Sequence, residues 1–406
     1  MVKLPSELWR NILSLAVNEP LSFLPAWDSC SWNSPVVEDI RMKLAICRVC
    51  RLFHAIGTEF LYNHLHFPRS SYDEIEHIAT VFEQHRHETG YVYGHATKRI
   101  DVRVECLASR LDVQPLLRLL RSVQNLAVLV FIPHPSDTFM HVTASRTIPI
   151  FDPVPMSQVS RVLEQRFKQT LRCLSLGISL SSLDGGVLPE LPLKTLELAM
   201  SQCHLDPHPC TATVTSLTLD LNLWPESDPL VWHFPSLKEL TLKSMTMRDR
   251  PRIEPFLKLN GSLITFLNII PFKGSRGINH IAYFLNACPQ LHHLALPNHI
   301  ICYHKELADR VEGPRIFSGI TAVSIQFSSG GYWLPSIFDT IKELFPNVEC
   351  IRHDLQERYL EAGMLPSMRT LQALGVKLEP GVSIEVERPT PEDILTDCAP
   401  GLISGP

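Results

Sequence analysis

Cysteine and histidine side chains gather at three places where their spacing could hold a metal ion. Cys47 and Cys50 are separated by two residues, as in zinc sites and redox pairs. Two denser groups follow, one made of Cys203, His204, His208 and Cys210 and the other of His299, Cys302 and His304. The first pair has no partner pair at zinc-finger spacing, and prolines interrupt the first of the denser groups. We interpret the pair as helix positions and both denser groups as loop linings, and expect no metal and no cofactor.

Sequence motifs of catalysis are missing from the chain. It contains no Gly-x-Ser-x-Gly, no Gly-x-x-x-x-Gly-Lys-Ser/Thr, no Gly-x-Gly-x-x-Gly and no His-Glu-x-x-His. Carboxylates and histidines are plentiful, but their spacing nominates no active site. We therefore expect a protein that is not an enzyme.

Composition narrows the class of protein further. The 406 residues are 45% apolar and 19% charged, which is enough apolar material for a large core in two or three domains. A net charge of −5 gives no basic surface for nucleic acid, and no run of eighteen apolar residues predicts a membrane span. Eleven scattered cysteines, with Lys3, Glu7 and Arg10 in place of a signal peptide, indicate reduced thiols and a location in the cytoplasm or nucleus.

The elements that must carry any function begin with a helical segment at the N-terminus. Ser6 is a good N-cap, and Leu8, Ile12 and Leu15 then fall on one face of a helix. Further helical stretches run from Ile40 through Phe53 to Phe67. Some sixty helical residues cannot bury all of these apolar side chains by themselves, so part of the apolar face should await a partner.

This segment resembles an F-box of the type that opens with Leu-Pro-x-Glu-Leu, as found in fungal proteins. The resemblance covers residues 4 to 67, and Val49-Cys50-Arg51-Leu52-Phe53 matches the core of the motif. It implies docking onto a Skp-type adaptor, which links such chains to a cullin-based ubiquitin ligase. The residues that would face the adaptor are Leu4, Pro5, Leu8, Ile12, Val49 and Cys50. The connection between the first two helices, Asn18–Asp39, is longer than the family's and could cover the docking face.

A short pattern, apolar-x-x-apolar-x-apolar, recurs beyond residue 95 and resembles degenerate leucine-rich repeats, which build one strand per coil. Its clear instances begin at Leu126, Leu171, Leu193, Val214, Leu237, Ile264, Leu291 and Ile320, with weaker echoes at Thr97, Val348 and Met368. Four X-Pro markers stand just before strands, at Phe234, Cys288, Phe345 and Leu365, where a proline ends the preceding helix. Helical spacing appears in 159–170, 278–287 and 337–344.

These observations predict an α/β fold in which a helical F-box precedes an irregular leucine-rich-repeat solenoid, with a parallel sheet on the concave side and helices on the convex side. The expected parts are an F-box-like domain over 1–69 with the insert 18–39, a linker over 70–94, the solenoid over 95–379 and a disordered tail over 380–406. The segment Thr143–Pro155 is expected to be a surface loop.

Alternation along the strands predicts which side chains face the concavity. Asp220 and Lys243 should lie about 5 Å apart on adjacent strands. Phe266 and Ile270 are apolar where solvent is expected, so either they anchor a partner or the register there is off by one residue. We predict that a target protein binds the residues that face the concavity in the middle repeats, which are Glu239, Lys243, Phe266, Ile270 and His293.

The sequence as a whole favours a substrate-recognition subunit of a cullin-based, SCF-type ubiquitin ligase. Its F-box would bind a Skp-type adaptor and its solenoid an unknown protein target, with no nucleic-acid or membrane partner. The alternative is a leucine-rich-repeat interaction scaffold with no ligase attached. Co-purification with an adaptor and a cullin would separate the two.

Overall fold

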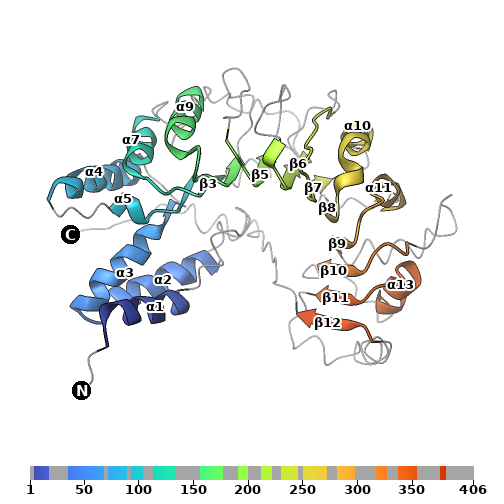
Figure 1. Ribbon diagram of the computed structural model, residues 1–406, viewed down its shortest axis with the longest axis horizontal. Coiled ribbons are helices and arrows are strands. Elements are labelled where there is room, and N and C mark those ends of the chain that lie inside the picture. Colours follow the sequence, from blue (N-terminus) through green and yellow to red (C-terminus); the bar gives the residue numbers. More distant parts are fainter. Residues whose placement is uncertain are drawn as a thin grey trace, which may run out of the picture.

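In the part of the chain that the structure describes, twelve strands form one parallel sheet in which each strand pairs with its neighbours in chain order (Figure 1). The computed structural model describes residues 4–17, 35–67, 72–88, 93–103, 113–132, 156–176, 191–199, 212–221, 230–245, 250–271, 281–297, 317–326, 337–353 and 375–380. The sheet curves into an arc, with strands lining its inside and helices its outside (Figure 1). This is an open α/β solenoid of leucine-rich-repeat character, as the recurring pattern predicts.

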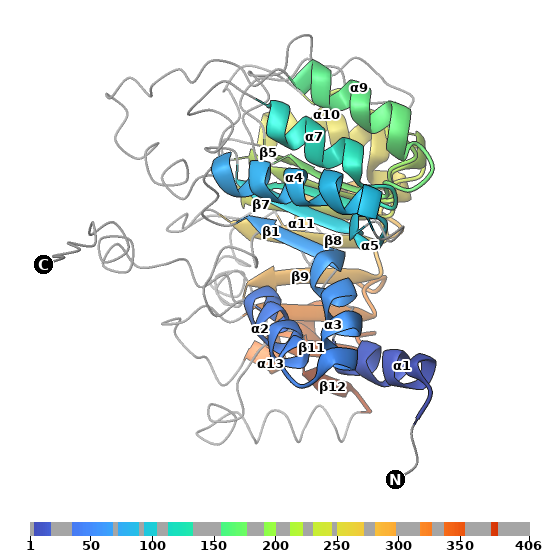
Figure 2. The ribbon, with the colours of Figure 1, turned by 90° about the vertical axis from the view of Figure 1, so that its left-hand side faces the viewer.

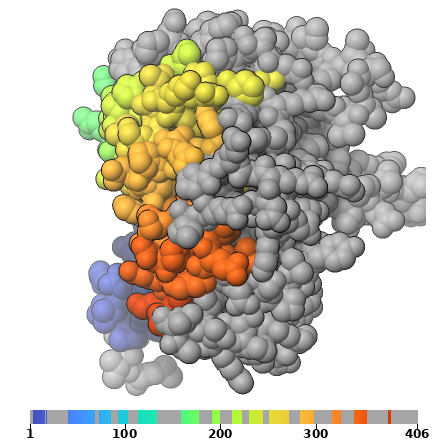
Figure 3. Space-filling model, turned by 90° about the vertical axis from the view of Figure 1, so that its right-hand side faces the viewer, coloured from blue at the N-terminus to red at the C-terminus, as the bar shows by residue number. Residues whose placement is uncertain are grey.

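The strands are short, as expected when each repeat contributes a single strand to the sheet. They are β1 (His64–Phe67), β2 (Arg99–Arg103), β3 (Val128–Ile132), β4 (Cys173–Leu176), β5 (Thr195–Ala199), β6 (Ser216–Asp220), β7 (Glu239–Met245), β8 (Phe266–Pro271), β9 (His293–Pro297), β10 (Ala322–Gln326), β11 (Cys350–His353) and β12 (Lys377–Pro380). Figure 3 shows the C-terminal half from the outside, where successive repeats follow from yellow to red.

The register of the sheet places the repeated apolar residues in line. Leu217, Leu240, Leu267 and Leu294 are direct partners on β6 to β9, and each is fully buried. The neighbouring row contains Leu219, Leu242 and Ile269 on β6 to β8. Burial of these rows between sheet and helices forms the main core, and it confirms the predicted register.

The helices cover the convex side of the sheet, apart from the three at the N-terminus. They are α1 (Ser6–Ala16), α2 (Pro35–Cys47), α3 (Arg51–Asn63), α4 (Tyr72–Glu88), α5 (Tyr93–Ala96), α7 (Gln114–Ser122), α9 (Met156–Phe167), α10 (Arg250–Asn260), α11 (Ile281–Ala287) and α13 (Ile337–Leu344). The helices predicted from apolar spacing over 159–170, 278–287 and 337–344 correspond to α9, α11 and α13. Figure 2 shows α4 and α7 running side by side over the sheet.

The sheet begins earlier in the chain than the sequence suggested. The strand β1 lies in the segment assigned to the F-box, and it pairs with β2 from His64 opposite Arg99 to Phe67 opposite Val102. The expected linker 70–94 consists largely of α4 and the start of α5. Although this segment is mostly polar, it carries an apolar stripe at helical spacing. Ile75, Ala79 and Phe82 form the stripe, and all three are buried. The segment expected to be a linker is thus largely helical.

Two of the three proline markers in the described residues behave as predicted, whereas no helix precedes Phe234-Pro235 in the described segment 230–234. The helix α11 ends at Ala287, directly before Cys288-Pro289, and α13 ends at Leu344, directly before Phe345-Pro346. The strands β9 and β11 follow within a few residues. The marker at Leu365, the echo at Met368, the loop 143–155 and the tail beyond 380 lie outside the described residues.

Adjacent repeats approach so closely at one point that only glycine fits. A Cβ atom on Gly261 would lie 2.1 Å from the backbone oxygen of Ala287 in the next repeat. Asn260, the preceding residue, is fully buried, and its side-chain oxygen accepts a hydrogen bond from Phe234 N at 2.7 Å. Its amide donates to the Trp232 and Phe256 carbonyls. These contacts hold the repeat before β7 against α10.

Candidate functional site

Large apolar side chains are exposed mainly on the first three helices. Of the ten such side chains in the described residues, eight lie between residues 4 and 52, and the other two are Val231 and Leu259. The eight, here called the helical apolar surface, are Leu4, Leu8, Ile12, Leu15, Met42, Leu44, Val49 and Leu52. Exposed apolar surface concentrated in this way marks an interaction site.

The helical apolar surface lies over a small core. Five buried side chains form that core, namely Leu13, Val17, Ile46, Ile56 and Phe60. Trp9 and Phe53 pack against it with their ring centroids 5.0 Å apart. Since so few residues are buried, the three helices hide only part of their apolar side chains.

All six residues predicted to face an adaptor are exposed, namely Leu4, Pro5, Leu8, Ile12, Val49 and Cys50. Pro5 rather than Ser6 is the N-cap of α1, and no side-chain hydrogen bond caps this helix. Cys50 is the N-cap of α3, where its thiol accepts a hydrogen bond from Phe53 N at 3.5 Å. Its structural role in α3 is therefore capping.

The three N-terminal helices, α1–α3, are here called the helical unit. This unit continues directly into the solenoid, because α3 ends at Asn63 and β1 begins at His64. The Tyr62 ring packs on Phe82 of α4 and Tyr93 of α5, at centroid distances of 5.3 and 4.7 Å. The Thr97 hydroxyl donates to the Tyr62 carbonyl at 2.9 Å. A protein bound to α1–α3 would thus be held in a fixed orientation relative to the sheet (Figure 1).

The predicted target-binding residues come together on the concave side. Glu239, Phe266 and His293 are direct neighbours across β7, β8 and β9, and Lys243 pairs with Ile270 on the first two of these strands. The register question raised by Phe266 and Ile270 is therefore settled, because both point away from the core row of Leu267 and Ile269. We call Glu239, Phe266, Ile270 and His293 the concave patch.

Phe266 and His293 form the centre of the concave patch. Their rings meet edge to face with centroids 4.7 Å apart. The His293 Nε2 atom lies 2.7 Å from the Ser324 hydroxyl of β10. Burial, with a smaller effect from the Arg352 charge, lowers the His293 pKa to about 4. The imidazole is therefore neutral at physiological pH and presents an aromatic, weakly polar surface.

Lys243 does not present its charge to solvent as predicted. Its residue surface is 9% exposed, and its Nζ atom lies 2.6 Å from Glu197 Oε1 of β5. The other carboxylate oxygen of Glu197 accepts from the Ser175 hydroxyl at 2.8 Å. Glu197 and Asp220 are buried as well. The ion pair thus ties β5 to β7 across β6, which makes Lys243 unsuitable as an exposed anchor.

A cluster of polar side chains on β1 and β2 escaped the sequence reasoning. His64, His66 and Asp101 offer three possible metal-ligand atoms within 4.8 Å of one another, and they are the one such group in the described residues. The alternation in His64-Leu65-His66 was the available signal, since it places both imidazoles on one face of a strand. The pair Cys47 and Cys50 belongs to no such group, and both later cysteine–histidine groups lie outside the described residues.

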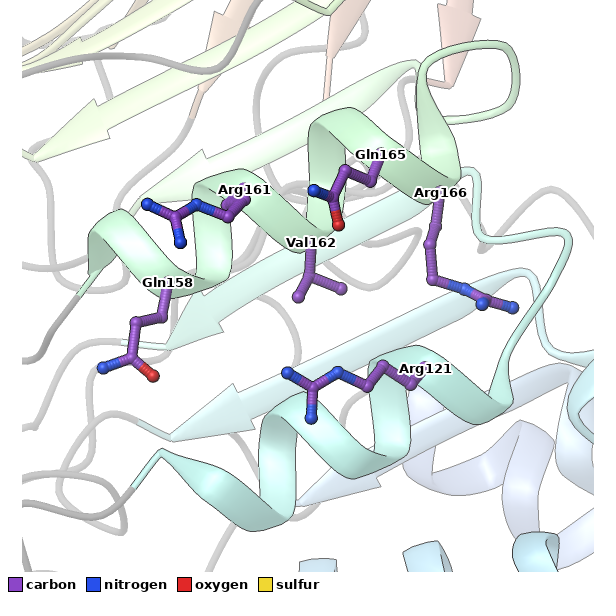
Figure 4. A pocket seen from close by; sticks show the side chains of 6 residues that line it. All are labelled: Arg121, Gln158, Arg161, Val162, Gln165 and Arg166. Atoms are coloured by element: carbon purple, nitrogen blue, oxygen red, sulfur yellow. The ribbon is translucent and has the colours of Figure 1, made fainter.

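A basic groove lies on the convex side between α7 and α9 (Figure 4). It has a volume of about 630 Å³ and is lined by Arg121, Gln158, Arg161, Val162, Gln165 and Arg166. Arg121 projects from α7 toward the α9 side chains, and Arg166 donates to the Val123 carbonyl at 3.5 Å. Its six lining residues include no carboxylate, so an anion would fit its charge.

Comparisons with known proteins identify no family for this chain. No family model matches it, and no curated protein matches it. A solved structure of a leucine-rich repeat-containing protein from Legionella pneumophila aligns with 62% of this chain and 82% of its own, at 13% identity and a TM-score of 0.35. None of the described helices is both long and apolar enough to cross a membrane.

Proposed function

We propose that this protein is the substrate-recognition subunit of a cullin-based, SCF-type ubiquitin ligase. The helical apolar surface docks a Skp-type adaptor, and the concave patch binds a target protein. The chain itself catalyses no reaction in this proposal, and the chemistry of ubiquitin transfer belongs to other subunits.

The observation that carries the proposal is the distribution of exposed apolar side chains. Eight of ten lie on or beside α1–α3, in the segment that resembles an F-box. Leu8, Ile12 and Leu15 follow one another at spacings of four and three residues, so they form a stripe on a single face of α1. Each is at least 46% exposed, which leaves the stripe available to a partner helix.

The direct joint between α3 and β1 supports the same proposal. A substrate receptor must hold its target at a defined position relative to the adaptor, and the Tyr62 contacts with Phe82 and Tyr93 hold the end of α3 against α4 and α5 of the solenoid. The solenoid then places the concave patch on the inside of the arc, facing away from the covering helices (Figure 1).

A leucine-rich-repeat interaction scaffold remains as a second candidate function, because the sheet and its concave patch would serve it equally well. In that case the helical apolar surface would bind something other than an adaptor. Affinity purification followed by quantitative mass spectrometry separates the candidates. The wild-type chain is expected to carry a Skp-type adaptor and a cullin, whereas a chain without both is a scaffold.

The variants for this experiment follow from the structure. Deleting residues 1–69 would remove β1 from the sheet, so point substitutions are preferable. Leu8→Asp with Ile12→Asp should lose the adaptor and the cullin while retaining target proteins. Asn11→Asp is the matched control, because it adds a carboxylate to an exposed polar position of the same helix. Equal loss of the adaptor in the control would contradict the proposal.

A further inference from the structure

Three potential metal ligands converge at the edge of the sheet where the helical unit joins it. His64 and His66 lie on β1, and Asp101 lies opposite His66 on β2. The Asp101 Oδ2 atom is 2.8 Å from His64 Nε2 and 3.3 Å from His66 Nδ1. The side chains of all three residues are at least 92% buried.

The types of side chain in the cluster suit metal binding. Burial lowers the pKa of His64. Burial alone would raise the Asp101 pKa, but the neighbouring His64 and Arg99 hold it well below its usual value. The site therefore offers two imidazoles and one carboxylate, which is a donor set that zinc and related divalent metals accept.

The hydrogen bonds within the cluster do not satisfy all of its polar atoms. His66 Nε2 is buried and has no hydrogen-bond partner. Both imidazoles approach the same carboxylate oxygen, and one ligand atom from each of the three residues lies within 4.8 Å of the other two, which is close enough for them to share one ion. We propose that His64, His66 and Asp101 form a binding site for a divalent transition metal ion, with zinc as the best match.

The positive charge of Arg99 disfavours a cation at this place. The position of its guanidinium nevertheless suits a metal site. Its Nε atom lies 2.7 Å from Asp101 Oδ1, the carboxylate oxygen that neither imidazole contacts. Arg99 thus orients the carboxylate so that Oδ2 faces the histidines, as outer residues orient ligands in many metal sites. Three protein ligands leave a fourth position for a water molecule.

The position of the site predicts what the metal would do. It would bridge β1, which continues directly from α3, to β2, the next strand of the solenoid. The metal would therefore fasten the helical unit to the sheet, and its effect should appear as zinc-dependent stability. This inference departs from the expectation of no metal, and it holds whether or not the helical unit binds an adaptor.

The experiment uses the full chain with Zn²⁺ as the probe. Since the sequence contains 18 histidines and 11 cysteines, bound zinc must be assigned by substitution. The wild-type chain and a His64→Gln/His66→Gln variant are dialysed against buffered zinc, and the metal is measured by plasma mass spectrometry. The wild type is expected to retain about one zinc ion per chain more than the variant. Zinc should also raise the melting temperature of the wild type but not that of the double variant.

His293→Gln is the matched control, because it replaces a half-buried histidine on the same concave side outside the cluster. It should bind as much zinc as the wild type. If the double variant fails to fold, cobalt spectra of the wild type and of the single variant His66→Gln decide, since Co²⁺ held by imidazoles in a four-coordinate site gives strong visible absorption bands that the variant should lose. Equal zinc content in all variants, or a wild type without a zinc-dependent melting temperature or such bands, would overturn the inference.

Discussion

The ring of Trp9 on α1 meets the ring of Phe53 on α3 edge to face, with the centroids 5.0 Å apart. Each aromatic residue directly follows an exposed leucine, Leu8 on α1 and Leu52 on α3. The contact therefore brings together the two segments that carry the F-box resemblance, although some forty residues separate them in sequence. An apolar surface made from both segments depends on this contact.

The stacked leucine rows give the first prediction. Leu240→Ala and Leu294→Ala should each lower the free energy of unfolding by about 2–5 kcal/mol, because both side chains are fully buried and their truncation leaves cavities. Thr241→Ala should cost under about 1 kcal/mol, since Thr241 lies on the concave side and is only partly buried. Urea denaturation measures the difference. Equal losses at Leu240 and Thr241 would contradict the register.

The close approach of two repeats gives the second prediction. Gly261→Ala should destabilise the solenoid by about 2–4 kcal/mol, because its Cβ would collide with the Ala287 backbone oxygen. Gly319→Ala is the control, since the nearest atom to its Cβ is the Leu291 oxygen at 3.6 Å, an ordinary contact distance. Thermal unfolding of both variants tests the contrast. A Gly261 variant as stable as the Gly319 variant would show that the repeats stack less tightly.

The concave patch gives the third prediction. Phe266→Ala together with Glu239→Lys should abolish capture of the target protein while adaptor binding is retained, because interfaces depend on a few aromatic and charged anchors. Lys243→Glu is unsuitable for this purpose, since it would place a second carboxylate beside the buried Glu197. Thr215→Ala, outside the concave patch, is a control. Identical pull-down profiles for the double variant and the wild type would locate recognition elsewhere.

The half-buried imidazole of His293 gives the fourth prediction. Its pKa is about 4 in the folded chain and 6.5 when unperturbed, so between these values the unfolded chain binds a proton that the folded chain does not. This contribution to stability is present above pH 6.5 and is lost as the pH falls toward 4. The free energy of unfolding should therefore decline less steeply over that range in His293→Gln. Parallel declines in both proteins would disprove the half-buried, neutral state.

The repeat pattern predicted the solenoid well because its signal is redundant. The buried positions of Leu217, Leu240, Leu267 and Leu294 recur at similar intervals, so one irregular copy does not obscure the register. The strand β1 has only four residues and follows a helix directly. Its alternation of apolar and polar residues is therefore too short to identify a strand from the sequence. The sequence also could not show that Lys243 pairs with Glu197, because that ion pair joins strands that are not adjacent.

The candidate sites were predicted unevenly for similar reasons. Exposure of Leu8 and Ile12 followed from counting apolar residues against the size of a three-helix unit, which is a local argument. The convergence of His64, His66 and Asp101 depends on the pairing of β1 with β2, between residues about 35 positions apart. Only the alternation of the two histidines was visible in the sequence.

Direct binding of a purified Skp-type adaptor tests the central claim most plainly. Isothermal titration calorimetry should show a one-to-one complex with the wild-type chain and with Asn11→Asp. Leu8→Asp should weaken binding by about 3 kcal/mol, roughly 100-fold, because the new carboxylate would be buried in an apolar contact. Unchanged leucine-rich-repeat stability in the variant would exclude misfolding. A wild-type chain that binds no adaptor, or a Leu8→Asp chain that binds it as tightly as the wild type, would contradict the account.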